Sequence, residues 1–125
     1  EGSDYGNGLS YWWEAGGFVL TGKTNSSGGD LAGTNPKGDY DAWAFRINAN
    51  SSNPGIIEYG RYGGAQYDAF FDYAYSVNPA TFVNIVDYFV GETASPLPNS
   101  DYHPSEGGAP TTDFWLMKPL NGGFS

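Results

Sequence analysis

This chain of 125 residues contains 19 glycines and 8 prolines, which are spread along its length. Each of them costs about 1 to 3 kcal/mol inside a helix relative to alanine, so long helices are disfavoured. The apolar residues stand in short runs between turn-forming clusters, and 18% of the chain is aromatic. Burial of aromatic rings builds a core with little aliphatic content. We therefore expect an all-β protein with many turns.

The two halves of the chain carry similar motifs in the same order. VLTGKT at 19–24 matches YFVGET at 88–93, and DYDAWAFRINAN at 39–50 has a weaker echo in DFWLMKPLN at 113–121. YGNG at 5–8 matches YGGA at 62–65, and the three offsets are 57, 69 and 72. The second copy then contains an insertion of about 12 residues. We predict two degenerate β repeats, residues 1–60 and 61–125, the second with this insertion and a long proline-rich loop at 95–110.

Four strands are expected in the first repeat, at residues 9–14, 18–23, 42–47 and 56–62, as an antiparallel meander. Residues 69–77, 82–91 and 114–118 match the first three of them. Because nothing matches the fourth, the second repeat is predicted to be incomplete and to leave an open sheet edge. Alternation in AWAFRI puts Trp43, Phe45 and Ile47 on one face, which we expect to face the core.

Four segments of the first repeat, GGFVLTGKTNSS, GDLAG, DYDAWAFRINANSS and IIEYGRYGG, resemble the bacterial β-propeller repeats that occur in strings on secreted and surface proteins. The second repeat matches at 62–64, 91–93 and 113–118, and departs at Pro119, where the first has Ile47. The resemblance implies two four-stranded, propeller-blade-like sheets and an extracellular setting. It implies no shared catalytic residues.

A propeller ring closes with about 4 to 8 blades, so two blades cannot close one. Three arrangements remain open. Several copies close a ring together, the chain is part of a longer repeat protein, or the units stack into an open array because a head-to-tail contact does not close.

The net charge of −9, with five lysines and arginines, argues against binding nucleic acid or anionic membrane surfaces. The chain has no cysteine, which excludes disulfides and thiol catalysis. No apolar run reaches the 18 residues that membrane insertion needs. Abundant Trp and Tyr with few Lys, together with much Asn, Ser, Thr and Gly, indicate a secreted or cell-surface protein.

The sequence contains only weak candidates for a catalytic site. The single histidine, His103, lies beside Ser100, Asp101 and Ser105 in an extended loop, where neighbouring side chains cannot converge on one point. Carboxylate pairs are available, such as Asp39 with Asp41, but 14 acidic residues offer such pairs by number alone. We expect no enzymatic activity.

Calcium is the one cofactor that the sequence suggests. Asp30, Asn35, Asp39 and Asp41 fall within twelve residues of a loop rich in turn carbonyls. Calcium takes 6 to 8 oxygen ligands from flexible loops of this kind. Lys37 stands in the middle of the set, and the alternative is that Asp30 and Asp41 cap turns through backbone N–H groups.

Sugar chemistry is suggested by tyrosines and sequons. Tyrosines beside predicted turns are candidate glycan contacts, and they are Tyr40, Tyr59, Tyr62, Tyr67 and Tyr102. The alternative is that such rings fill the space between sheets. Asn25 and Asn50 each begin an Asn-Ser-Ser sequon in a predicted surface loop, which makes a glycoprotein sterically feasible.

Two functions follow as hypotheses. In the first, the protein is a structural subunit that assembles with copies of itself through open β edges, as a filament or surface layer. The residues expected at its junctions are Glu1, Tyr5, Ile56, Tyr62, Leu120 and Phe124. In the second, the chain is a lectin whose copies form a propeller ring that binds glycans between blades through the loop tyrosines, with or without calcium.

Overall fold

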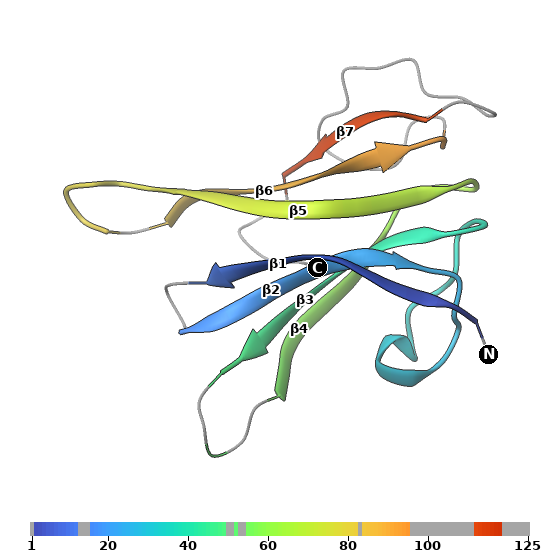
Figure 1. Ribbon diagram of the computed structural model, residues 1–125, viewed down its shortest axis with the longest axis horizontal. Coiled ribbons are helices and arrows are strands. Elements are labelled where there is room, and N and C mark those ends of the chain that lie inside the picture. The colour runs from blue at the N-terminus through green and yellow to red at the C-terminus, as the bar shows by residue number, and fades with distance from the viewer. Residues whose placement is uncertain are drawn as a thin grey trace.

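The computed structural model describes residues 2–12, 16–49, 52, 55–82, 84–95 and 112–118, which form seven strands in two antiparallel sheets (Figure 1). Sheet 1 has the order β1 (Asp4–Trp12), β2 (Gly17–Thr24), β3 (Asp41–Asn48), β4 (Gly55–Tyr62). Sheet 2 has the order β5 (Asp68–Val77), β6 (Asn84–Thr93), β7 (Asp113–Met117). A short 3-10 turn, η2 (Gly29–Leu31), lies in the β2–β3 loop. The all-β prediction is confirmed, and in the described residues the sheets do not close into a ring.

Among the described residues no helix has the length and hydropathy needed to cross a lipid bilayer.

The two sheets are stacked as two layers, with the core between them (Figure 1). Trp43 in β3 and Trp115 in β7 each stand opposite a glycine of their own sheet, Gly22 or Gly91. We call the side of a sheet that bears this tryptophan its tryptophan face and the other side its reverse face. The tryptophan face of sheet 2 packs on the reverse face of sheet 1, and the core cluster contains Val19, Ala42, Ala44, Phe70, Tyr73, Phe89, Trp115 and Met117.

A polar group joins the two layers beside this core. Arg46 of β3 forms ion pairs with Glu58 of β4, at 3.1 Å, and with Asp87 of β6, at 3.2 Å. Asp87 also accepts a hydrogen bond of 2.6 Å from the Tyr73 hydroxyl. Burial, and then this bond, raise the pKa of Tyr73, so the hydroxyl keeps its proton and remains a donor. The buried charges are thus paired across the interface.

The expected orientation of β3 is wrong. The core between the sheets receives Ala42 and Ala44, whereas Phe45 and Ile47 are half-buried on the outer side of sheet 1. Trp43 is buried on that outer side, where it stands opposite Gly22 in the register. The physical reason is size, because the small side chains of β3 leave room for the large rings of sheet 2.

The beginning of β1 also differs from the prediction. Its YGNG motif lies inside the strand, with a β-bulge that leaves Asn7 outside the register. A bulge at the same place in β5 leaves out Phe71. Tyr5–Gly8 therefore corresponds to 69–72, not to YGGA at 62–65, which follows β4. The first offset is 64 rather than 57, and most of the predicted insertion disappears.

Gly22 and Gly91 occupy corresponding positions, each opposite a tryptophan of its own sheet. A Cβ on Gly91 would overlap the Ala69 carbonyl oxygen and lie 3.0 Å from the Phe70 Cα. The contacted atoms belong to the backbone of β5, which cannot move away as a flexible side chain could. A side chain here is therefore excluded by close packing.

We expect Gly91→Ala to lower the free energy of unfolding by about 2 kcal/mol, because the added methyl overpacks a strand pair. Gly6→Ala is the matched control, since nothing lies within 4 Å of its added Cβ and its change should stay below about 0.5 kcal/mol. Chemical denaturation followed by circular dichroism measures both. Equal losses in the two variants would contradict the steric argument.

Candidate functional site

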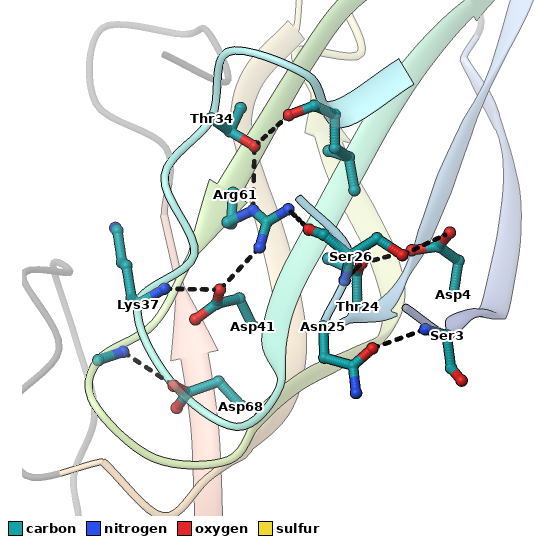
Figure 2. Close-up of polar contacts among 12 residues, drawn as sticks. Ser3, Asp4, Thr24, Asn25, Ser26, Thr34, Lys37, Asp41, Arg61 and Asp68 are labelled. Atoms are coloured by element: carbon teal, nitrogen blue, oxygen red, sulfur yellow. Dashed lines mark hydrogen bonds and ion pairs between the residues drawn. The ribbon is translucent and has the colours of Figure 1, made fainter. Parts of the chain in front are cut away.

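The first sheet ends in a small hydrogen-bonded group made by Asp4, Thr24 and Ser26 (Figure 2). The Thr24 hydroxyl donates to Oδ1 of Asp4, and the Ser26 hydroxyl donates to Oδ2 at 3.1 Å. The Ser26 backbone N–H then donates to the Thr24 hydroxyl oxygen at 2.9 Å. The carboxylate of β1 thereby holds the chain as it leaves β2.

The second sheet repeats this group with Asp68, Thr93 and Ser95. The Thr93 hydroxyl donates to Oδ1 of Asp68 at 2.5 Å, the Ser95 hydroxyl to Oδ2 at 2.7 Å, and the Ser95 N–H to the Thr93 hydroxyl oxygen at 3.1 Å. The Thr-x-Ser spacing was visible in the two halves of the sequence. Its acidic partner was not, because it comes from a different strand.

Asp68 is fully buried, and its carboxylate accepts a third hydrogen bond from the Gly64 N–H at 2.8 Å. Burial raises the pKa of Asp68, and the donors from Thr93, Gly64 and Ser95 oppose that rise. The folded protein therefore holds a proton on this carboxyl up to a higher pH than the unfolded chain does.

Arg61 of β4 organises the β2–β3 loop (Figure 2). Its guanidinium donates to the Thr34 hydroxyl at 3.0 Å, to the Ser26 carbonyl oxygen, and to Oδ2 of Asp41 at 3.0 Å. The Lys37 N–H donates to the same Asp41 oxygen at 2.9 Å. The Arg61 and Asp41 side chains are 1% and 0% exposed, so this ion pair is fully desolvated.

The four proposed calcium ligands are not gathered by the structure. Asp41 is buried against Arg61, whereas Asp30, Asn35 and Asp39 are exposed. Among the described residues no group of three or more acidic or histidine side chains is placed to hold a metal ion. Calcium binding stays a prediction, and the positive charge at Asp41 is supplied by the guanidinium.

Lys23 stands among three tyrosine rings. Its Nζ lies 5.0 Å from the ring centres of Tyr5 and Tyr40 and 4.7 Å from that of Tyr67. It also donates to the Tyr67 hydroxyl at 3.1 Å, and this bond is the main cause of the raised pKa of Lys23. Two proposed glycan contacts, Tyr40 and Tyr67, are thus brought together, but a lysine of the same chain lies over their faces.

The other proposed glycan tyrosines do not join this group. Tyr62 packs on Phe70 and Phe89 in the core, with ring centres 5.5 and 6.3 Å away. Tyr59 is exposed on the outer side of sheet 1, 5.9 Å from the ring of Phe45. Tyr102 lies outside the described residues.

The proposed junction and sequon residues are placed in part. Tyr5 and Ile56 are exposed, and Tyr62 is half-buried in the core. The Asn25 side chain is exposed and accepts a hydrogen bond of 2.6 Å from the Ser3 N–H. The remaining proposed residues lie outside the described part of the chain, and they are Glu1, Asn50, Leu120 and Phe124.

A cleft of about 220 Å³ opens beside η2 on the tryptophan face of sheet 1. It brings two carboxylates, Asp4 and Asp30, near two aromatic residues, Trp43 and Phe45. A second hollow of about 330 Å³ adjoins it and shares Asp4, Gly28 and Gly29. Rings combined with a few polar groups are the usual lining of small-molecule sites.

The outer surfaces of both sheets are apolar. On the tryptophan face of sheet 1, Leu9 is 65% and Tyr11 55% exposed, and Phe18, Ile56 and Tyr59 are exposed beside them. On the reverse face of sheet 2, Phe114 is 54% exposed, with Tyr88 exposed and Val90 and Leu116 half-buried. Apolar areas of this kind on a soluble protein mark contact surfaces.

Comparisons with models of protein families, with curated proteins and with solved structures find no match.

We expect Arg61→Met to lower the free energy of unfolding by about 3 to 5 kcal/mol, because it leaves the buried Asp41 carboxylate without its charge partner. Adding Asp41→Asn should recover part of this loss, since no unpaired charge then remains. Lys37→Met is the control, because its side chain is exposed and the change should stay below about 0.5 kcal/mol. Chemical denaturation at pH 7 measures all three, and a double variant no more stable than Arg61→Met would contradict the argument.

The stability advantage of the wild type over Asp68→Asn is expected to shrink as the pH rises. A carboxyl whose pKa is raised on folding contributes stability that is fully present below its unfolded value of 3.8, and this contribution is lost as the pH rises through the folded value. Denaturant titrations of both proteins from pH 3.5 to 7 measure the difference. An advantage that grows with pH would mean that the pKa of Asp68 is lowered on folding.

Proposed function

We propose that this protein is a non-enzymatic, extracellular structural subunit that assembles with copies of itself, as a filament or a surface layer. The observation that carries the proposal is the apolar outer surface on both sides of the stacked sheets. Leu9 and Tyr11 on one side and Phe114 on the other are each more than half exposed. A chain with net charge −9 stays soluble while such surfaces find their partners.

The open edges of the sheets add a second contact surface. Within the described residues β4 and β7 each pair with one strand, so each forms an edge of its sheet. A strand from a neighbouring copy is able to extend either sheet by β-augmentation. Residues 120–125 are the candidates for this role, whereas Asp4 and Tyr5 already pair with β2.

The finer description of the fold as two propeller-blade-like repeats is part of the proposal. It is supported by the two Asp–Thr–Ser groups, the bulges at Asn7 and Phe71, and the glycines opposite Trp43 and Trp115. Blades stack face to face in a propeller, as these two sheets do. Copies that continue the stacking form either a closed ring or an open array.

The alternative function is a lectin whose copies form such a ring. The cleft lined by Asp4, Asp30, Trp43 and Phe45 favours it, because carboxylates and ring faces are groups that hold sugar hydroxyls and sugar carbon faces. This cleft replaces the loop tyrosines as the candidate glycan site, since Lys23 covers Tyr40 and Tyr67.

Purified protein is expected to form particles much larger than its 13.4 kDa chain, and their size should grow with concentration. Size-exclusion chromatography with light scattering, followed by electron microscopy, measures this. Long fibres or sheets support the structural subunit and exclude the lectin ring. A discrete ring that binds a glycan array supports the lectin, and a monomer at millimolar concentration contradicts both.

A further inference from the structure

We propose that copies stack head to tail, with the reverse face of sheet 2 in one copy packed on the tryptophan face of sheet 1 in the next. This inference rests on the proposed self-assembly and names its interface. The occupant of each exposed face is a second copy of the chain, and the contact continues the packing that already joins the two sheets within one copy.

Strands β1, β2 and β3 of sheet 1 correspond to β5, β6 and β7 of sheet 2. Asp4 pairs with Thr24 and Thr24 with Asp41, just as Asp68 pairs with Thr93 and Thr93 with Asp113. The bulges in β1 and β5 come three residues after Asp4 and Asp68. Positions on one sheet can therefore be assigned to positions on the other from hydrogen-bond register alone.

The corresponding faces differ sharply in exposure. Tyr73 on the tryptophan face of sheet 2 is 4% exposed, because sheet 1 covers it, whereas Leu9 in the same position on sheet 1 is 65% exposed. Phe89 is fully buried, and its counterpart Leu20 is only half-buried. The tryptophan face is therefore covered by a neighbouring sheet in sheet 2 but exposed in sheet 1.

Large and small side chains change places between the internal interface of one chain and the proposed interface between copies. In the internal interface, large residues on the tryptophan face meet small ones on the reverse face, and these are Phe70, Tyr73 and Phe89 against Val19, Ala42 and Ala44. At the corresponding exposed positions the tryptophan face carries small or medium residues and the reverse face large ones, and these are Gly6, Leu9 and Leu20 against Tyr88, Phe114 and Leu116. A loss of volume on one surface is matched by a gain on the other, as a packed interface between them requires.

Not every position follows this exchange. Trp43 repeats Trp115 unchanged, and Phe45 is larger than its counterpart Met117. Phe18 stands where Asp87 pairs with Arg46 in the internal interface, so the contact between copies is more apolar at that point. Both faces carry large exposed apolar side chains, Leu9 and Tyr11 on one and Tyr88 and Phe114 on the other.

One glycine allows the close approach of β1 and β5 within the chain. A Cβ on Gly8 would overlap the Phe71 carbonyl oxygen, so glycine lets β1 and β5 approach within one chain. The counterpart of Gly8 on sheet 2 is Asp72, which has a side chain. The Asp72 carboxylate accepts a hydrogen bond of 3.0 Å from the Ser10 hydroxyl, so it also holds β5 against β1 within the chain.

Two single variants test the pairing of the faces. Leu9→Asp places a charge on the tryptophan face of sheet 1, and Phe114→Asp places one on the reverse face of sheet 2. Both side chains are more than half exposed, so the fold should be kept, which circular dichroism and thermal unfolding check. Each variant alone is expected to need at least a tenfold higher concentration to assemble, because the contact would bury an unpaired carboxylate.

An equimolar mixture of the two variants is expected to form dimers that do not assemble further. Each copy then has one intact face, and the intact faces are the two that pair. Sedimentation velocity measures the dimer, and Phe82→Asp is the matched control, since Phe82 is 62% exposed in the turn between β5 and β6 and should assemble as the wild type does.

Other results overturn the inference. If either variant alone forms dimers, like faces pair with like, and if both assemble as the wild type does, the contacts lie elsewhere, for instance at the strand edges. In these two cases the proposed self-assembly stands while its interface is wrong. A wild type that remains monomeric under the same conditions overturns both.

Discussion

The packing of the aromatic side of sheet 2 on the small residues of sheet 1 determines most of this structure. Ala42 and Ala44 leave room for Phe70, Phe89 and Trp115, and burial of such rings stabilises the fold by about 25 cal/mol for each Å² removed from water. Because successive side chains of a strand point to opposite sides, the choice of the alanine side for the core leaves Trp43, Phe45 and Ile47 on the outer side. The exposed apolar face is therefore a consequence of how the core is built.

Composition and alternation predicted the β class and most of the strands, because glycine, proline and period-two patterns act locally. They did not predict which side of β3 is covered, since that depends on residues of β5, β6 and β7 far along the chain. The first strand was expected to begin at Leu9, whereas β1 begins at Asp4 and contains the GNG motif as a β-bulge. Of the Asp–Thr–Ser groups, the sequence shows the repeated Thr-x-Ser spacing but does not show which aspartate joins each pair.

The β2–β3 loop shows the same limit in its electrostatics. Its acidic and amide residues suggested a cation, and the cation that the structure supplies to Asp41 is the guanidinium of Arg61. Arg61 is 20 residues away in the sequence and on another strand, so no local pattern links the two. Loop tyrosines were predicted as sugar contacts for a similar reason, while Lys23 and the fold place two of them around an ammonium group.

A chain that is 18% aromatic is at risk of cross-β aggregation, and the β-bulges affect this risk. A bulge interrupts the ladder of a strand, and an incoming strand cannot then pair along its full length. Among the described edge strands β1 and β5 contain such interruptions, and the pairing of β4 with β3 is also irregular. The pairing of β7 shows none, so the segment Asp113–Met117, with Phe114 exposed, is where amyloid-like growth of the chain would begin.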